Sequence, residues 1–395
     1  MPHHIPLIST LAVGLAFAFI AGLIATRLKL PALVGYLIAG IAVGPFTPGF
    51  IADEQLAPQL AEIGVILLMF GVGMHFSLRD LMAVRKIAIP GAIGQMLVAT
   101  LLGVGLAVLW GWSLISGLVF GLALSVASTV VLLRALEARG IVNTATGRIA
   151  VGWLIIEDLA MVLALVLLPA MADDHPDGDS MAMVLTFTLL KVTGFVVLML
   201  VVGTKLFPWL LAFVERTGSR ELFSLAAVTL ALGVAYGSAM LFDVSFALGA
   251  FFAGVVINES ALSDRVAEES RPLQDLFGVL FFVSVGMLFD PMVLVNHPLQ
   301  VLAVVAVIIV GKGVAAFVIV RMLGHPHETA AIVAASLAQI GEFSFILAGL
   351  GIALKLISQQ ASDLILAGAL LSIILNPLVF RFGLRQTRQG TAQSS

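Results

Sequence analysis

The sequence predicts an all-α polytopic membrane protein, and two observations lead to that fold class. Of 395 residues, 61% are hydrophobic and 11% are charged, whereas an ordinary soluble domain is about 25% charged. The hydrophobic residues form runs along the whole chain, and many of these runs have the ~20 residues that a helix needs to cross a bilayer core. The net charge of −3 is carried in short clusters between these runs, so it does not indicate a nucleic-acid partner. The chain has no cysteine, which excludes disulfides and thiol chemistry.

Thirteen apolar runs predict thirteen transmembrane helices. They lie at 5–26, 31–46, 58–75, 87–109, 113–136, 147–169, 181–206, 220–241, 243–258, 271–290, 298–322, 329–353 and 362–383. If the N-terminus is outside, 17 of the 20 Lys and Arg residues fall on the cytoplasmic side, as the positive-inside rule requires. The C-terminus is then cytoplasmic, and the bacterial inner membrane is the expected location. The first run lacks a preceding basic segment and a small-residue cleavage site, so it is predicted to be a span rather than a removed signal peptide.

Two adjacent carboxylates, Glu157 and Asp158, interrupt the sixth run, "GWLIIEDLAMVLAL". Asp158 lies about 15 Å along the helix from Arg148, and therefore near the middle of a bilayer. A charge at that depth costs ~3 kcal/mol, so it faces the helix bundle or a water-filled cavity and usually has a partner. Lys312 in the eleventh run, "VIIVGKGVAAF", has a matching depth. A purely structural ion pair would account for Lys312 and one acid, and would leave the second acid unexplained.

Polar residues also gather in the fifth and twelfth runs. The stretch "LALSVASTVVLL" holds Ser125, Ser128 and Thr129, and "SLAQIGEFSFIL" holds Gln339 and Glu342. Serine and threonine often bond back within an intact membrane helix, so each stretch alone is a weak signal. In secondary transporters, however, two discontinuous helices meet near the bilayer midplane at the interface of an inverted repeat. The fourth to sixth and eleventh to thirteenth helices are predicted to be its two matching halves.

Six stretches, in this order, resemble the monovalent cation:proton antiporter-2 family, and within it the Kef-type potassium efflux and YbaL-like group. They are "LPALVGYLIAGIAVGP" (30–45), "LAEIGVILLMFGVGMHFS" (60–77), "GLALSVASTVVLL" (121–133), "GRIAVGWLIIEDLA" (147–160), "LFGVLFFVSVGMLFDP" (276–291) and "AQIGEFSFIL" (338–347). The resemblance implies a sodium/proton-antiporter-like fold of thirteen helices, with two crossing discontinuous helices, which works as a homodimer in the lipid bilayer.

The resemblance also implies a fixed scaffold and a core that moves against it in the manner of an elevator. The expected parts are scaffold and dimerisation helices 1–3 at 1–86, core helices 4–6 at 87–170, linker helix 7 at 171–219, scaffold helices 8–10 at 220–297, core helices 11–13 at 298–383 and a cytoplasmic tail at 384–395.

By the same resemblance, Asp158 is the site at which H⁺ or an alkali cation binds. Glu157 occupies the first position of the paired motif and would pair with Lys312, which matches the family's membrane lysine. The residues implied at the ion and proton site are Asp158, Glu157, Thr129, Ser128 and Ser125, with Lys312, Glu342 and Gln339 as supporting groups.

Two departures from the family pattern bear on function. Kef-type relatives carry Gln where this chain has Glu157, and some sodium/proton antiporters carry Asp, so K⁺ and Na⁺ both stay open as the cation. Kef-type relatives continue into a nucleotide-binding regulatory domain. This sequence ends at "FGLRQTRQGTAQSS", and no G-x-G-x-x-G follows a predicted strand, so the sequence itself gives no sign of dinucleotide binding. Either the sequence is a shortened form of a longer chain with that domain, or it is a relative without it. No cofactor is expected beyond the transported ions.

The predicted function is monovalent cation:proton antiport, with H⁺ and the cation competing for Asp158, and pH homeostasis is its expected use. A gated cation channel or efflux system would need similar buried acids, but the sequence has no filter-like repeat. A non-transporting sensor relative is the second alternative, and the intact set of buried charges disfavours it. An enzyme is not expected, because the histidines lie at predicted loop edges or in an outer loop.

Overall fold

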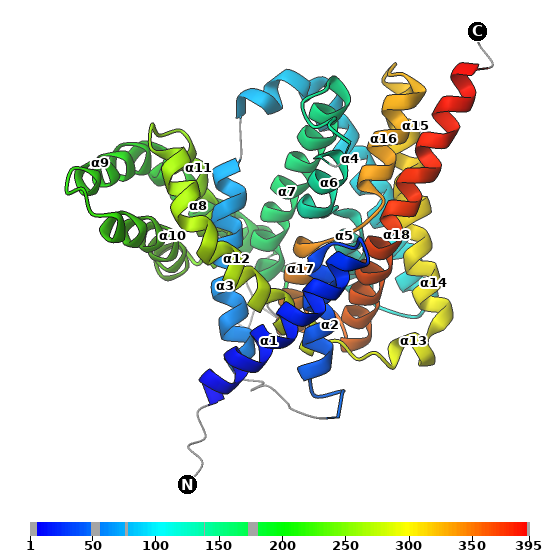
Figure 1. Cartoon of the computed structure of the whole chain (residues 1–395), viewed down its shortest axis with the longest axis horizontal. Coiled ribbons are helices and arrows are strands. Elements are labelled where there is room, and N and C mark those ends of the chain that lie inside the picture. The colour runs from blue at the N-terminus through cyan, green and yellow to red at the C-terminus, as the bar shows by residue number, and fades with distance from the viewer. Residues whose placement is uncertain (1–5, 49–55, 76–77, 138, 173–180, 393–395) are drawn as a thin grey trace. The chain divides into compact units, whose positions relative to one another are not determined.

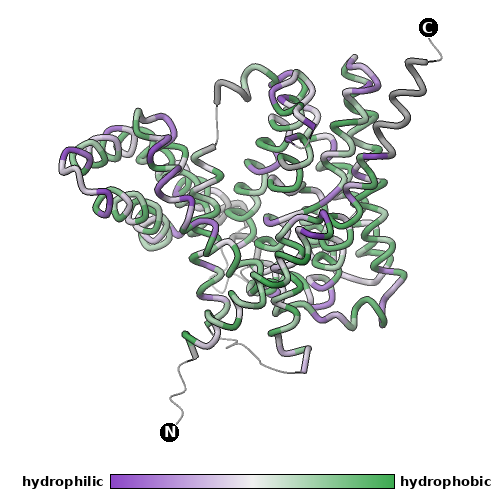
Figure 2. The backbone as a smooth tube through the Cα atoms, in the orientation of Figure 1, coloured by the Kyte–Doolittle hydropathy of each residue, from purple (hydrophilic) through white to green (hydrophobic). Residues whose placement is uncertain are grey.

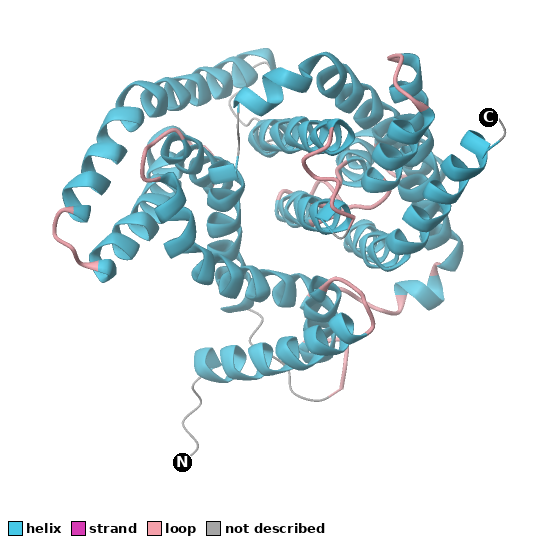
Figure 3. Ribbon diagram, turned by 45° about the horizontal axis from the view of Figure 1, so that its top comes forward, coloured by secondary structure: helices cyan, strands magenta, loops and turns pink. Residues whose placement is uncertain are grey.

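The computed structural model describes residues 6–48, 56–75, 78–137, 139–172 and 181–392. His3, His4, His175 and the last three residues of the predicted tail lie outside them. All regular elements of the described residues are helices, as the composition predicts (Figure 3). Hydrophobic residues run along most of these helices (Figure 2), which is the pattern of a protein solvated by lipid rather than water.

Nine helices of the described residues are long and apolar enough to cross a membrane, or ten if one bent helix pair counts as a single span. Three further predicted spans coincide with α2 (Ala32–Val43), α11 (Phe246–Asn258) and α12 (Ser263–Met287). The first two have only 12 and 13 residues, and α12 begins with the charged stretch "SDRVAEESR". All thirteen predicted runs therefore fall on helices, while the number of complete membrane crossings stays a prediction.

Contacts within the chain divide it into two compact units. The first unit comprises Met1–Ile24, Gly35–Ser77 and Val162–Leu288. Besides α12, α11 and most of α2, its helices are most of α1 (Pro6–Arg27), α3 (Leu56–His75), the C-terminal part of α7 (Ala145–Ala172), α8 (Met181–Leu198), the π-helical segment η1 (Met199–Gly203), α9 (Thr204–Glu215) and α10 (Arg220–Phe242) (Figure 1).

Glycines let helices of the first unit approach closely. A Cβ atom at Gly40 of α2 would collide with the carbonyl group of Val283 in α12. Likewise, a Cβ atom at Gly286 of α12 would collide with the carbonyl group of Leu37 in α2. Membrane helices associate mainly through such close packing, because lipid chains supply no hydrophobic drive between them.

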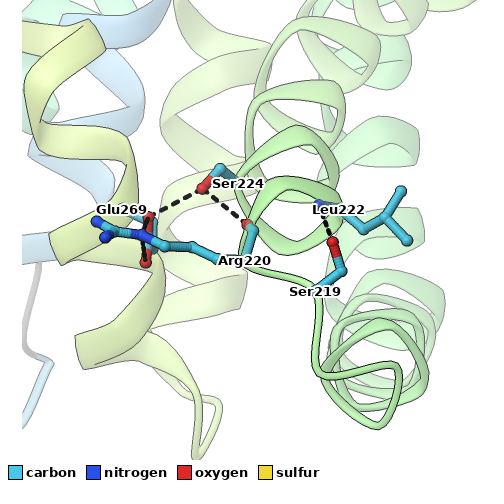
Figure 4. A network of polar contacts seen from close by, with 5 residues as sticks. All are labelled: Ser219, Arg220, Leu222, Ser224 and Glu269. Carbon is cyan, nitrogen blue, oxygen red and sulfur yellow. Dashed lines mark hydrogen bonds and ion pairs between the residues drawn. The ribbon is translucent and has the colours of Figure 1, made fainter.

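A polar network joins α10 to α12 in the first unit (Figure 4). The Arg220 Nε atom lies 2.8 Å from one oxygen of Glu269, and the Ser224 hydroxyl donates to the other at 2.9 Å. Ser219 caps α10 by accepting a hydrogen bond from the Leu222 amide at 3.2 Å. The hydrogen bonds from Arg220 and Ser224 favour the charged carboxylate, so they hold the pKa of Glu269 below its usual value.

The second unit comprises Ala25–Val34, Leu78–Met161 and Phe289–Ser395. Its helices are α4 (Leu78–Leu109), α5 (Leu114–Ser125), α6 (Thr129–Glu137), the N-terminal part of α7, α13 (Val293–Asn296), α14 (Pro298–Ala306), the π-helical segment η2 (Val307–Gly311), α15 (Lys312–Met322), α16 (His327–Leu337), α17 (Glu342–Ala353) and α18 (Gln359–Ala392).

Four helices extend beyond their predicted bounds by eight residues or more, among them α12, which begins at Ser263 rather than at residue 271. α4 begins at Leu78 rather than at residue 87, and the run of helix that includes α8 continues to Glu215 rather than ending at 206. α18 continues to Ala392, so most of the predicted tail after 383 is helical. The turns added to α4 and α18 contain Arg, Lys, Gln and Leu, which have good helix propensity but lower the hydropathy of the segment. The turns added before Glu215, "FPWLLAFVE", are apolar and continue the span.

Candidate ion-binding site

The second unit contains two helix breaks at the predicted positions. The chain leaves the helix after Ser125 and resumes it at Thr129, with Val126 in an extended conformation. The Ser128 hydroxyl accepts a hydrogen bond from the Val131 amide at 3.3 Å and so caps α6. The Ser125 hydroxyl donates to the Leu122 carbonyl at 2.7 Å. The hydroxyl groups predicted to mark a break therefore bond to the backbone at its two ends, where intrahelical partners are missing.

The second break separates α16 from α17, whose axes are bent by 42°. Gly341 is the last residue of this break, and a Cβ atom there would lie 2.6 Å from the Cα atom of Ser128. Only a glycine fits at that distance. The two breaks, more than 200 residues apart in sequence, therefore touch each other.

Gln339 joins the two breaks through its side-chain amide. Its Oε1 atom accepts a hydrogen bond from the Ser128 backbone N–H at 2.9 Å. Its Nε2 atom donates to the carbonyl groups of Ser128 and Ser336, both at 3.2 Å. Gln339, Ser128 and Ser336 are all completely buried, so these hydrogen bonds satisfy polar groups that water cannot reach.

The side chain of Glu342 lies at the N-terminus of α6. Its Oε2 atom accepts a hydrogen bond from the Ser128 hydroxyl at 3.0 Å, and the residue is 2% exposed. A carboxylate is stabilised there because the first amides of a helix carry a partial positive charge. Ser344, in the first turn of α17, donates to the Ala123 carbonyl at 2.6 Å. The start of α17 is thus fixed to both ends of the first break.

Glu157 and Asp158 both lie on α7 and both are buried, with exposed fractions of 0% and 5%. The Oε2 atom of Glu157 accepts a hydrogen bond from the Ala127 amide, inside the first break, at 2.8 Å. The Oδ2 atom of Asp158 lies 3.5 Å from the Thr129 hydroxyl, a long contact. The second oxygens, Glu157 Oε1 and Asp158 Oδ1, have no hydrogen-bond partner in the described part of the protein. Each acid therefore retains an oxygen that can accept a proton or a cation.

Lys312 follows the π-helical segment η2 directly and is completely buried. Its Nζ atom donates to the Gln339 carbonyl, in the second break, at 2.9 Å. Among the described residues, no ion pair within 4.0 Å joins Lys312 to Glu157, so the predicted direct pair is not formed in this structure. Lys312 and Glu157 bond to the helix breaks rather than to each other, because each break leaves backbone groups without a helical partner. The Gln339 carbonyl accepts from Lys312, and the Ala127 amide donates to Glu157.

Two buried amides complete the surroundings of the breaks and were not predicted. Gln95 of α4 donates to the Ser125 carbonyl, at the end of α5, at 3.0 Å, and accepts from the Trp153 indole at 3.2 Å. Asn376 of α18 donates to the Ala335 carbonyl at 3.0 Å. Both are lone polar residues within apolar runs, which is the signal by which they could have been found.

The oxygen atoms gathered here suit an alkali cation. Carboxylate, hydroxyl and backbone carbonyl groups are hard donors, which bind such ions rather than transition metals. Groups of three or more His, Asp or Glu side chains able to hold a metal ion are absent from the described residues. The candidate site is therefore Asp158 with Thr129 and the first break beside it. Every residue predicted at the site lies in the second unit.

Two broken helices that meet beside buried acids are typical of secondary transporters. Residues 15–386 match the family described as sodium/hydrogen exchanger, transmembrane. The chain belongs to this family.

Three comparisons make the relationship more specific. The chain is 61% identical, over 384 residues, to YbaL of Escherichia coli (strain K12), a candidate cation/proton antiporter; the match covers 96% of this chain and 69% of that protein. It is 35% identical to K(+) efflux antiporter 4 of Arabidopsis thaliana, over 95% of this chain and 63% of the plant protein. The structure is similar to that of the sodium proton antiporter MjNhaP1 from Methanocaldococcus jannaschii, with a TM-score of 0.73, 19% identity and coverage of 96% and 99% of the two chains. The predicted resemblance is thereby confirmed.

Proposed function

We propose that the protein exchanges a monovalent cation for protons across a membrane. The observation that carries this proposal is Asp158, a carboxylate buried in the second unit with one oxygen unpaired. An isolated buried charge of this kind is costly, and binding either H⁺ or a cation removes that cost. The relatives named as cation/proton and K(+) efflux antiporters support the same function.

Competition at Asp158 explains how exchange would be coupled. H⁺ and the cation neutralise the same carboxylate, so binding of one displaces the other. Thr129 is the nearest hydroxyl, and its contact at 3.5 Å leaves space for adjustment around a bound ion. With the site neutralised, its passage through the apolar part of the membrane becomes less costly, whereas an empty and charged site stays in place. Exchange is then favoured over leak.

Glu157, Lys312 and Glu342 have supporting roles in this proposal. Each is tied to a helix break by a hydrogen bond of 3.0 Å or less. They hold the unwound backbone of both breaks in a fixed geometry. Asp158 has no such bond, which leaves it as the group that exchanges ions.

The proposed movement is an elevator, in which a core carries the site past a scaffold. The division into two units supports it, because the second unit contains all the site residues. Expected core segments 87–170 and 298–383 lie largely in the second unit, and scaffold segments 1–86 and 220–297 lie largely in the first. We also propose thirteen spans, an inverted repeat with two crossing broken helices, and a homodimer in the bacterial inner membrane with a cytoplasmic C-terminus.

The test is dissipation of a pH gradient in proteoliposomes, with Na⁺, K⁺, Rb⁺ and Li⁺ added in turn. The wild type is expected to respond to Na⁺ or K⁺. Asp158→Asn is expected to reduce the response to that of liposomes without protein. Asp275→Asn serves as the matched control, since Asp275 is an acid of α12 outside the site. Retained exchange in Asp158→Asn would overturn the assignment, and cation flux that needs no counter-ion would favour a channel.

A further inference from the structure

The second unit has a cavity of about 670 Å³ that takes no part in the candidate ion site. It lies among the N-terminal turns of α4, the first turns of α7 and the turn after α15. Its polar lining is basic and consists of Arg85, Lys86, Arg148 and His325. The remaining described lining residues are apolar, with no acidic side chain among them.

The positive charges around this cavity are not neutralised within the described part of the chain. None of the three ion pairs there includes Arg85, Lys86 or Arg148. Among the described residues, the Arg85 guanidinium donates a hydrogen bond to the Met82 sulfur at 3.5 Å, and the Arg148 guanidinium donates to the Asn143 carbonyl at 2.8 Å. Each arginine has five N–H donors, so most of them remain available for a ligand. A cavity lined by three exposed cationic side chains, with no acid among its described lining residues, is suited to an anion.

Two exposed apolar stripes lead away from the cavity. On α4, Ile89, Ile93 and Leu97 are 38%, 57% and 57% exposed. They follow Lys86 at intervals of three or four residues, which places them on the same helix face as its ammonium group. The second stripe is on α15, where Val314, Val318 and Met322 are 55%, 45% and 80% exposed and are spaced by four.

α4 and α15, which carry the two stripes, pack against each other. The side chain of Ile319 on α15 reaches the position of Gly94 on α4, where its Cδ1 atom would lie 3.1 Å from an added Cβ atom. A molecule with a charged head in the cavity could therefore lay its apolar chains along both helices.

We propose that this cavity binds the phosphate headgroup of an anionic phospholipid, with its acyl chains on the α4 and α15 stripes. A soluble phosphate compound would use the cavity alone, whereas a lipid matches both the cavity and the stripes. The proposed topology places Arg85, Lys86 and Arg148 on the cytoplasmic side, where basic pockets between transmembrane helices bind lipid headgroups. The inference does not depend on which cation the protein exchanges.

Native mass spectrometry of the purified chain in detergent tests this proposal. Phosphatidylglycerol and cardiolipin are titrated against phosphatidylcholine, whose headgroup has no net charge. The wild type is expected to prefer the two anionic lipids. The triple variant Arg85→Gln, Lys86→Gln and Arg148→Gln is expected to bind them on the order of a hundredfold more weakly, at about fivefold for each positive charge removed.

The matched control removes two arginines and a lysine from exposed positions of the first unit, as Lys205→Gln, Arg216→Gln and Arg271→Gln. Its lipid affinity is expected to change by less than about threefold, because distant charges are screened. Equal binding of phosphatidylglycerol and phosphatidylcholine, or equal losses in the two triple variants, would overturn the proposal. If the cavity triple fails to fold, the three single variants carry the same comparison.

A second titration separates a lipid from a soluble ligand. Glycerol 1-phosphate, which has the headgroup chemistry without acyl chains, is added up to millimolar concentration. Competition with phosphatidylglycerol only at far higher concentration supports a lipid site. If glycerol 1-phosphate binds as tightly as the lipid, the apolar stripes contribute nothing and the lipid assignment is wrong.

Discussion

Gln339→Met tests whether one side chain holds the two helix breaks together. Methionine has a similar length and no strong hydrogen-bonding group, so the substitution removes the contacts of Gln339 with little change in volume. These contacts are the three hydrogen bonds to Ser128 N–H, Ser128 C=O and Ser336 C=O.

The expected loss of stability can be worked out from those contacts. The Ser128 N–H is buried and would lose its partner, at a cost of about 1–3 kcal/mol. The Ser128 carbonyl keeps a second partner, the Leu132 amide at 3.1 Å, so its bond contributes about 1 kcal/mol, and the bond to Ser336 contributes a similar amount. The sum is about 4 kcal/mol, which lowers Tm by about 8 °C or more for a unit of this size.

Thermal unfolding in detergent, followed by intrinsic tryptophan fluorescence, measures this loss. Gln300→Met is the matched control, because Gln300 accepts a single hydrogen bond from Gln360, at 2.8 Å, away from both breaks. Its expected change in Tm is about 2–4 °C. A Gln339→Met variant that melts within about 2 °C of the control would refute the conclusion that this amide fixes the breaks.

Two further predictions concern close packing and pH. Gly341→Ala is expected to lower both Tm and cation-dependent proton movement, since the added methyl group would collide with Ser128. Gly349→Ala is the control and should leave both unchanged, because nothing lies within 4 Å of its added Cβ. Equal effects of the two substitutions would contradict the packing argument. Glu269→Gln is expected to lower Tm at neutral pH only slightly, because solvent screens the largely exposed Arg220. Since the folded pKa of Glu269 is depressed, its contribution is present above the unfolded value of about 4.3 and is lost as pH falls through the folded pKa. Melting curves from neutral to strongly acidic pH should therefore converge for wild type and variant, and a difference that grows in acid would show that the sign is wrong.

The helices and the position of the buried acids could be predicted from the sequence because both depend on local properties. A run of apolar residues specifies a span, and Asp158 at its middle needs a special environment whatever the neighbours are. The two breaks were also predictable, since "SVAST" and "QIGE" concentrate polar and small residues at mid-depth.

The partners of the site residues could not be predicted, because they depend on which backbone groups a break leaves unpaired. Lys312 was expected to contact an acid, yet it donates to the Gln339 carbonyl. Gln95 supports the end of α5 although it is thirty residues away from Ser125. A lone amide in an apolar run indicates that a partner exists, but its identity is a property of the tertiary packing.

The π-helical segment before Lys312 holds one residue more than an α-helix would hold over the same rotation about the axis. A π turn contains more residues per turn than an α turn, so the five residues Val307–Gly311 turn the chain by nearly as much as four α-helical residues, each of which adds about 100°. Deleting one of these residues would therefore let the segment relax to an ordinary α-helix with the Lys312 ammonium group still directed toward Gln339. Straightening all five residues into an α-helix without a deletion would instead rotate Lys312 by roughly the angle of one residue. The π segment thus keeps the lysine directed at the second break despite the additional residue.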